Sequence, residues 1–324
     1  MRYRVLFFLI FIPALLFTVK LFFDNSYHIA RVAGISSSRE LVSPLSSVTP
    51  PKESPLGDFV TAQLAGTKGT YGIVVLNLIT DESFLLNEHT TFKTASLYKL
   101  WVMATAYDLI REGKLKETDI LSQDLNLLYN KFGLASPSAQ IVVPTGSPDA
   151  PADTEDKTNE SEKISLTVGN ALERMITISD NNSALLLTER VKLANITAFL
   201  DKHGFSESMV GIKGGDPITS SYDIALFLKK LYNNELTDQV HTDKMLTLLK
   251  RQRLNGKLPK YLPKQSIIAH KTGELDSYSH DAGIVYAPPG EYIIVVLSET
   301  TSRAQADERI ALLSQSVYKY FVNN

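Results

Sequence analysis

The stretch TFKTASLYKLWVMAT, residues 91–105, places Ser96 and Lys99 at the head of an apolar run. Apolar residues recur at helical spacing up to Glu112, and Gly113 follows, so the pattern predicts a helix that begins at Ser96. In one interpretation, Ser96 caps this helix and Lys99 points to solvent. In the other, the two side chains act together, because residues three apart lie on the same face of a helix. The rest of the sequence has to decide between them.

The composition argues against several classes of function. The chain has 324 residues, a formal net charge of −2 and no cysteine. A nearly balanced charge argues against a nucleic-acid partner. The lack of cysteine excludes disulfides, thiolate metal ligands, a cysteine nucleophile and a lipid anchor on cysteine. The six histidines show no H-x-x-x-H or H-x-H spacing, which argues against a zinc hydrolase. We therefore expect neither a metal nor a cofactor.

The N-terminus predicts a membrane segment over residues 1–24. Two arginines are followed by an almost unbroken apolar run from Val5 to Phe23, close to the ~20 residues that span a bilayer. The arginines favour a cytoplasmic N-terminus. No small-x-small site follows the run, so we favour an uncleaved anchor over a cleaved signal peptide, and either over a buried core helix. The prediction is a single-pass protein of the cell membrane with an extracytoplasmic domain, or alternatively a secreted protein.

Two polar segments delimit the folded part of the chain. Residues 25–56 become rich in serine and proline, a composition typical of linkers, so we expect one domain over residues 57–324. Residues 134–163 consist mostly of Pro, Ser, Thr, Asp, Glu and Lys. This composition predicts a disordered or extended surface insertion.

Strand patterns occur at the two ends of this domain, and helical patterns fill its middle. The predicted strands are TYGIVVLNL (70–78), SFLLN (83–87), SIIAHKTG (266–273), DAGIVYAP (281–288) and YIIVVLSE (292–299). The pattern of residues 304–321 predicts a closing helix. We predict an α+β fold of the three-layer α/β/α type. One antiparallel sheet combines the N- and C-terminal strands, helices flank it, and a second lobe is mostly helical.

Two further motifs follow Ser96 along the chain. ITISDNNSA contains Ser179–Asn181 between two predicted helices, and AHKTGELDS contains Lys271–Gly273 at the end of a predicted strand. From average composition, S-x-x-K is expected about once in a chain of this size, and each of the other two motifs about a tenth of a time. All three occur in order, which favours the interpretation of Ser96 as a nucleophile.

Each of these residue types suits one step of acyl transfer. A buried Lys99 would have a lowered pKa, and its neutral amine could take the proton of Ser96. Ser179 could relay a proton to the leaving nitrogen, and Asn181 could hold the substrate amide. Lys271 would supply positive charge near Ser179 and near a substrate carboxylate.

The residues after Lys271 suit substrate binding. Thr272 adds a hydroxyl donor, and Gly273 leaves the strand without a side chain, so that a substrate backbone can add to it. We expect the N–H groups of Ser96 and Glu274 to form an oxyanion hole. The side chain of Glu274 is expected in solvent, and Asp180 is expected to brace its loop.

In these three motifs the chain resembles the family of class A β-lactamases and penicillin-binding proteins, which are serine acyl-enzymes. The similarity covers about residues 57–324. It includes paired strands before the serine, the run SDNNSALLL into a helix, TAFLDKHG after it, and a strand pair after HKTG. The resemblance implies that Ser96 is the nucleophile and Lys99 its base or base partner. It implies second-motif roles for Ser179 and Asn181, and third-motif roles for Lys271, Thr272 and Gly273.

One departure from the family concerns deacylation. Class A enzymes carry E-x-x-L-N in a loop after the second motif, and its glutamate activates the deacylating water. Residues 204–223, GFSESMVGIKGGDPITSSYD, lack this pattern, and Glu207 and Asp216 are their acids before Asp223. A general base contributes roughly 10²–10⁴-fold to a rate. We therefore expect slow deacylation.

The other departure concerns the substrate carboxylate. No arginine follows the KTG motif on the next strand, where Ser279 and His280 stand instead. His280 is a candidate donor to the substrate, with a structural role in the strand as the alternative. The predicted site thus has the catalytic residues Ser96, Lys99, Ser179 and Lys271, and the substrate-binding residues Asn181, Thr272, Gly273, Glu274 and His280.

Three functions compete. The first is a β-lactamase-like serine hydrolase that opens β-lactams through a Ser96 acyl-enzyme. The second is a penicillin-binding protein or D,D-peptidase that acts on peptidoglycan stem peptides. The third is a non-catalytic cell-wall sensor or scaffold, against which the intact S-x-x-K argues. As partners we expect a small β-lactam or a D-Ala-D-Ala-type peptide and, through the N-terminal segment, the membrane. We expect no nucleic acid and a monomeric chain.

Overall fold

The computed structural model describes residues 55–134, 162–211, 215–288 and 290–323. The predicted membrane segment, nearly all of the predicted linker and most of the predicted insertion lie outside the described residues. Within these ranges, no helix has both the length and the apolar character that crossing a bilayer requires. The first described residue, Pro55, already begins a helix, just before the predicted domain boundary. Proline suits the first turn of a helix, because the N–H that it lacks has no partner there.

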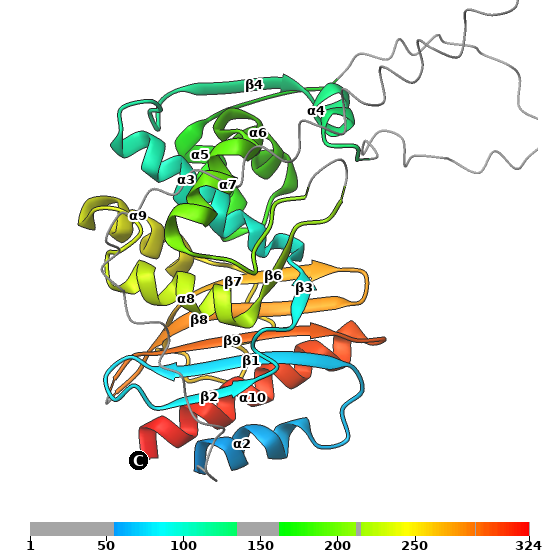
Figure 1. The fold of residues 1–324 in the computed structure, drawn as a ribbon, viewed down its shortest axis with the longest axis vertical. Helices are drawn as coiled ribbons and strands as arrows, with labels where there is room; N and C mark the ends of the chain where they lie inside the picture. Colours follow the sequence, from blue (N-terminus) through cyan, green and yellow to red (C-terminus); the bar gives the residue numbers. More distant parts are fainter. Residues whose placement is uncertain (1–54, 135–161, 212–214, 289, 324) are drawn as a thin grey trace, which may run out of the picture. The chain divides into compact units, whose positions relative to one another are not determined.

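Five strands form one antiparallel sheet in the order β2-β1-β9-β8-β7 (Figure 1). Their bounds are β1 (Thr70–Asn77), β2 (Ser83–Leu86), β7 (Ile267–Leu275), β8 (Tyr278–Tyr286) and β9 (Tyr292–Glu299). Strand β1 pairs with β9 along its whole length, from Thr70 opposite Glu299 to Asn77 opposite Tyr292. The N- and C-terminal strands therefore share a sheet, as predicted. Strand β7, which carries the third motif, is an edge strand of this sheet.

Helices cover both faces of the sheet. Helices α2 (Pro55–Leu64) and α10 (Arg303–Asn323) pack on one face, and α8 (Ser221–Tyr232) and α9 (Gln239–Lys250) lie on the other (Figure 1). Because both faces are covered, nearly every residue of β1 and β9 is buried, without the alternation of a one-sided sheet. The core on the α2 and α10 side includes Leu56, Val60, Ile73, Val75, Ile294, Val296, Ile310, Leu313 and Val317.

A second, mostly helical lobe surrounds α3. Its helices are the 3₁₀ helix η1 (Ala95–Tyr98), α3 (Lys99–Arg111), α4 (Leu125–Lys131), α5 (Val168–Thr177), α6 (Asn181–Val191) and α7 (Leu193–His203). Helix α3 is buried from Lys99 to Tyr107, because α5, α6, α7 and α9 pack around it. Sheet and lobe together confirm the predicted α+β fold.

Two short strand pairs were not predicted. Strand β3 (Thr91–Lys93) pairs with β6 (Ile218–Ser220), and β4 (Ile120–Asp124) pairs with β5 (Lys163–Thr167). Strand β5 begins at the C-terminal end of the segment that we predicted as a polar insertion. These strands have three to five residues, and stretches this short carry little periodicity when no neighbouring hairpin pattern marks them.

The helix that we predicted from Ser96 begins differently. It starts as the 3₁₀ turn η1, in which Ser96 is an internal residue, and neither Thr94 nor Tyr98 makes a side-chain cap hydrogen bond. The interpretation of Ser96 as a cap is therefore wrong. At α8, by contrast, a serine does cap the helix, because Ser220 Oγ accepts a hydrogen bond from the backbone N–H of Asp223 at 3.1 Å.

Candidate active site

Two residues of the site have a left-handed backbone conformation. Ala95 has a φ of 46° and Ser179 a φ of 58°. This conformation costs a residue with a Cβ roughly 1–2 kcal/mol, and such costs concentrate at functional sites. Ala95 turns the chain immediately before Ser96, and Ser179 stands in the turn between α5 and α6. Backbone strain thus positions the two serines of the first and second motifs.

Lys99 joins the first motif to the second. Its side chain is fully buried, and Nζ donates to the carbonyl oxygen of Ser179 at 2.6 Å, to Ser179 Oγ at 3.2 Å and to Asn181 Oδ1 at 2.7 Å. Burial lowers the pKa of Lys99 to about 7, against a smaller opposing effect of the Asp180 charge. A large fraction of Lys99 is therefore neutral near pH 7, as a general base for Ser96 requires.

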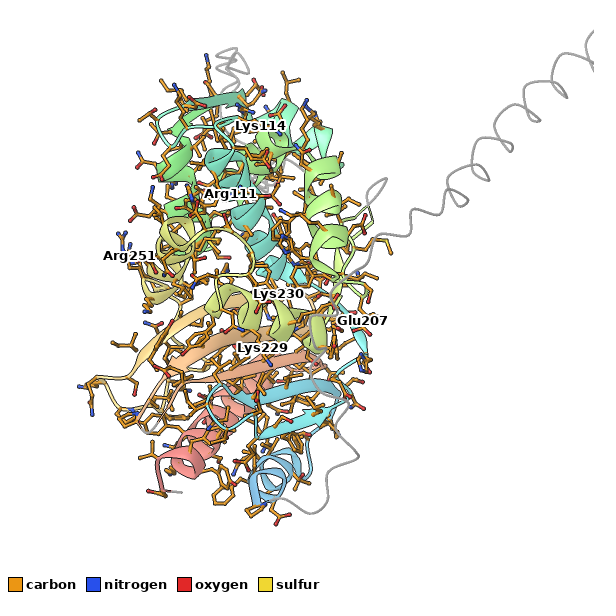
Figure 2. All side chains as sticks on the ribbon, turned by 60° about the vertical axis from the view of Figure 1, so that its left-hand side comes forward. Arg111, Lys114, Glu207, Lys229, Lys230 and Arg251 are labelled. Atoms are coloured by element: carbon orange, nitrogen blue, oxygen red, sulfur yellow. The ribbon has the colours of Figure 1, made fainter. Side chains whose placement is uncertain are left out.

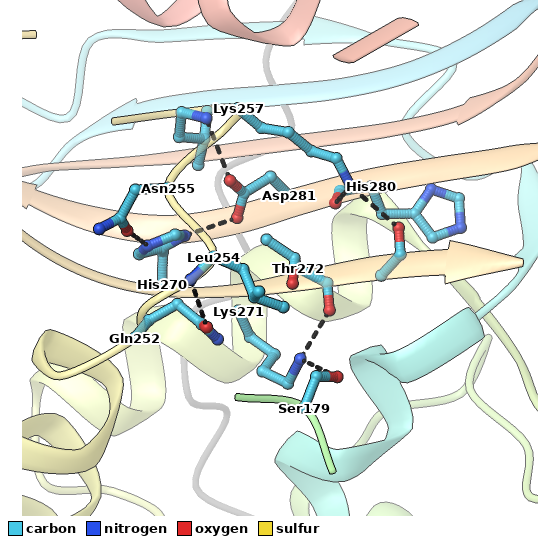
Figure 3. Close-up of polar contacts among 12 residues, drawn as sticks. Ser179, Gln252, Leu254, Asn255, Lys257, His270, Lys271, Thr272, His280 and Asp281 are labelled. Atoms are coloured by element: carbon cyan, nitrogen blue, oxygen red, sulfur yellow. Dashed lines mark hydrogen bonds and ion pairs between the residues drawn. The ribbon is translucent and has the colours of Figure 1, made fainter. Parts of the chain in front are cut away.

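Lys271 joins the third motif to the same serine. Its Nζ donates to Ser179 Oγ at 2.9 Å and to the carbonyl oxygen of Thr272 at 2.8 Å (Figure 3). Burial, and then the charge of Lys99, lower the pKa of Lys271 well below its usual value. Two buried ammonium groups that share one hydroxyl repel each other. The pair of lysines therefore carries one positive charge more readily than two. Ser179 Oγ lies between the two lysines, where it can pass a proton onward.

Asp180 has the bracing role that we expected. It caps α6, and its Oδ1 accepts hydrogen bonds from the backbone N–H of Ser183 at 2.8 Å and from Ser183 Oγ at 2.5 Å. Asn181 is the first residue of α6 and is exposed at the site. The cap therefore fixes both Ser179 and Asn181 relative to Lys99.

The structure shows why residue 273 has no side chain, which the sequence did not reveal. A Cβ built on it would lie 3.1 Å from the carbonyl oxygen of Thr94 and 3.2 Å from Cδ2 of His280. The missing side chain therefore makes room for the segment that leads into Ser96. The addition of a substrate backbone to the edge of this strand stays a prediction. The close approach brings the third motif beside the first.

Gly273→Ala should therefore disturb the nucleophile. The new methyl group has to displace Thr94 or β7 by a few tenths of an ångström, and small misplacements of reacting groups can cost roughly 10²-fold in rate. We expect the predicted acylation of Ser96 to slow about tenfold or more, with the melting temperature much less affected. Gly256→Ala, at a glycine whose Cβ would meet no atom within 4 Å, is the matched control. An unchanged acylation rate in Gly273→Ala would contradict the packing role.

His280 takes the structural alternative. Its ring is fully buried. Nε2 lies 2.8 Å from the carbonyl oxygen of Lys93, to which it donates, and Nδ1 accepts the backbone N–H of Ser298 at 3.1 Å. Burial lowers the pKa of His280 to about 4, so the ring is neutral near pH 7. With both ring nitrogens occupied, His280 ties β8 to β9 and β3, and the geometry does not support the predicted contact with substrate.

Lys257 is a residue of the site region that the sequence did not reveal. Its buried ammonium lies 2.9 Å from Glu274 Oε1. It also lies within 3.4 Å of the carbonyl oxygens of Gly273 and His280 (Figure 3). The side chain of Glu274 is 48 % exposed, as expected for a group in solvent, and its ion pair with Lys257 holds it in place. A lysine in the polar stretch LNGKLPK carries no sequence signal for burial, because its partners are distant in the chain.

A buried network holds the loop that carries Lys257. His270 Nδ1 contacts Asp281 Oδ1 at 2.9 Å, and its Nε2 contacts Asn255 Oδ1 at 3.2 Å (Figure 3). Asp281 Oδ2 accepts the backbone N–H of Leu258 at 3.0 Å. Asn255 and Leu258 belong to the loop, and His270 directly precedes Lys271. The loop is therefore fixed to the strands of the third motif.

The two acids of residues 204–223 that precede Asp223 have side-chain partners. Glu207, which is labelled in Figure 2, accepts a hydrogen bond from Ser220 Oγ, and its other oxygen lies 2.7 Å from Nδ1 of His89. Asp216 pairs with Lys93 at 2.7 Å. Both carboxylates, which lie in the described part of this segment, are therefore engaged by other side chains.

Comparison with known proteins agrees with this geometry. A family model described as the β-lactamase enzyme family matches residues 55–321. No curated protein matches the chain. The solved structure of PBP-A is similar, with 23% sequence identity and a TM-score of 0.68 over 85% of this chain and 100% of that chain.

Two further solved structures are similar in fold. A β-lactamase from Sphaerobacter thermophilus DSM 20745 has 20% identity and a TM-score of 0.67, over 82% of this chain and 96% of that chain. A mutant of PBP-A, solved as an acyl-enzyme complex with penicillin G, has 22% identity and a TM-score of 0.67, over 83% and 96%. At these identities, the structures share the fold with this chain.

Proposed function

The chain belongs to the β-lactamase enzyme family, and on this premise we propose that it is a class A-like serine hydrolase that opens β-lactams through an acyl-enzyme on Ser96. The observation that carries the proposal is the pair of buried lysines on Ser179 Oγ, Lys99 at 3.2 Å and Lys271 at 2.9 Å. Burying two ammonium groups costs much free energy unless each is paired and hydrogen-bonded, so two of them around one hydroxyl point to a role in the site. Perturbed lysines of this kind are typical of sites that move protons.

The proposed reaction begins with acylation. Neutral Lys99 takes the proton of Ser96, and Ser96 Oγ attacks the lactam carbonyl carbon. The carbonyl oxygen gains negative charge, which the N–H groups of Ser96 and Glu274 would stabilise. The carbon–nitrogen bond then breaks, and the proton reaches the nitrogen through Ser179, between Lys99 and Lys271. The product is an ester on Ser96 with the ring open.

We further propose that this ester is hydrolysed slowly. The acids Glu207 and Asp216 are engaged with Ser220, His89 and Lys93, and a missing general base costs roughly 10²–10⁴-fold. A mutant of PBP-A, a protein of the same fold, was solved as an acyl-enzyme complex with penicillin G, which supports acylation by a β-lactam as an outcome of this architecture. The N-terminal segment would anchor the domain, as a monomer, on the outer side of the cell membrane.

The slow deacylation also favours a second candidate, a D,D-peptidase of the penicillin-binding type. The same residues would acylate Ser96 with a peptidoglycan stem peptide, and a water or an amine would then release it. A scaffold without chemistry is disfavoured, because it would have no use for two buried lysines around Ser179.

Intact-mass spectrometry of the full chain tests the proposal. The protein is mixed with benzylpenicillin or a cephalosporin and sampled over time, and peptide mapping locates the adduct. A persistent adduct on Ser96 would support slow deacylation, and a transient adduct with loss of drug would identify a fast lactamase. Wild-type protein that forms no adduct and consumes no drug in large excess would overturn the proposal.

A further inference from the structure

The charges beside the third motif are arranged unusually for a site that receives an anionic substrate. Glu274 directly follows Gly273 on the edge strand β7, and its carboxylate is 48 % exposed. The cation beneath it, Lys257, is buried. Both β-lactams such as benzylpenicillin and peptides that end in D-alanine carry a carboxylate close to the bond that is broken. A substrate carboxylate beside Thr272 would therefore approach another negative charge.

Lys257 cannot pair with a substrate carboxylate while it is paired with Glu274. An ammonium group has three N–H donors. In this structure they face Glu274 Oε1 at 2.9 Å, the carbonyl oxygen of Gly273 at 3.4 Å and that of His280 at 3.3 Å. A substrate carboxylate gains Lys257 as a partner when Glu274 leaves it.

The surrounding charges are balanced as long as Glu274 is ionised. Asp307 lies 3.7 Å from Lys257 and accepts a hydrogen bond from Ser279 Oγ at 2.5 Å. The hydrogen bond and charge of Lys257, and then the charges of the exposed Arg303 and of Lys271, hold the pKa of Glu274 below its usual value. Burial lowers the pKa of Lys271 itself, and without Lys271 the two cations Lys257 and Arg303 match the two carboxylates of Glu274 and Asp307. Removal of the Glu274 charge would leave this edge of the site net positive.

We propose that Glu274 is a specificity-determining residue that competes with the substrate's own carboxylate for Lys257. The site then prefers substrates in which the carboxyl group on the leaving-nitrogen side of the scissile bond is uncharged, masked as an ester or amide. This inference rests on the proposed acylation of Ser96. It concerns the charge of the substrate, whereas the chemistry of bond breaking belongs to Ser96, Lys99 and Ser179.

The test compares benzylpenicillin with its uncharged methyl ester, which has the same ring. Second-order acylation rates are measured by intact mass at low ionic strength, since salt screens charge effects. In Glu274→Gln, the ratio of the benzylpenicillin rate to the ester rate should rise at least about fivefold over wild type. The control Glu308→Gln removes a carboxylate of similar exposure, 41 %, that pairs with Lys260, and it should leave the ratio at the wild-type value. A ratio in Glu274→Gln within twofold of wild type would overturn the inference.

A binding measurement separates this inference from the proposed function. Calorimetric affinities of the same two compounds are compared in Ser96→Ala and in the double variant that also carries Glu274→Gln. Their ratio should rise by a similar factor without any covalent step. If wild-type protein forms no adduct while the affinity ratio rises, the proposed function fails and the inference stands. If adducts form while neither ratio moves, or if neither compound binds, the inference fails.

Discussion

Ser96→Ala should abolish the covalent adduct with benzylpenicillin. Ser96 follows the strained residue Ala95 in η1 and is the nucleophile of the proposed acylation. Loss of a serine nucleophile costs roughly 10⁶-fold in hydrolases of this kind of mechanism. We therefore expect no mass increase over hours, at drug concentrations that label the wild-type protein completely.

Ser122→Ala is the matched control for this variant. Ser122 is an exposed serine on β4, outside the three motifs, and its removal should leave labelling at the wild-type rate. Circular dichroism and melting temperature show whether each variant is folded. An adduct of unchanged mass on folded Ser96→Ala protein would show that another residue is the nucleophile.

Lys99→Met should slow acylation of Ser96 by roughly 10²–10⁴-fold, the contribution of a general base. In the wild type, burial lowers the pKa of Lys99 to about 7. The neutral amine is the active form, so the acylation rate should rise with pH up to about 7 and level off above it. Below this pH, Lys99 is protonated and cannot accept the proton of Ser96. The variant should lose this rise across the pH range around 7, which rapid-quench mass spectrometry can follow.

The pH profile distinguishes catalysis from packing. A merely structural lysine would change the rate by the same factor at each pH and leave the midpoint in place. Lys244→Met, at a lysine of α9 that is 44 % exposed and pairs with Glu117, should retain both the rate and the profile. If the acylation rate of Lys99→Met still rose with a midpoint near pH 7, the titrating group would be a residue other than Lys99.

The sequence predicted the parts of the site that local patterns determine. Long strands such as β1 and β9, and the helix after Ser96, follow from hydrophobic periodicity. The three motifs predicted which residues meet at Ser179, because their order and spacing are specific. It could not predict the 3₁₀ turn η1, since φ of 46° at Ala95 is imposed by packing and not by residue preference.

The features that the sequence did not reveal depend on contacts between residues that are distant in the chain. Lys257 looks like an exposed loop lysine, and it is buried because carbonyl groups of β7 and β8 surround it. His280 is polar and close to the third motif, and its bonds to Lys93 and Ser298 depend on the sheet order. Gly273 suggested an open strand, and its close neighbour proved to be Thr94.

The pairing of β1 with β9 has a consequence for how the molecule is made. Residues 70–77 can enter the sheet when residues 292–299 have been synthesised, so the topology has a high contact order and favours slow folding. Until then β1, nearly all of which is buried in the finished domain, can pair with β2 but lacks β9 on its other side. The contact between η1 and β7 likewise forms late, since β7 is joined to β1 through β8 and β9. Covalent labelling of Ser96 would therefore report that η1 and β7 have come together, and its time course in a refolding experiment would follow the formation of this contact.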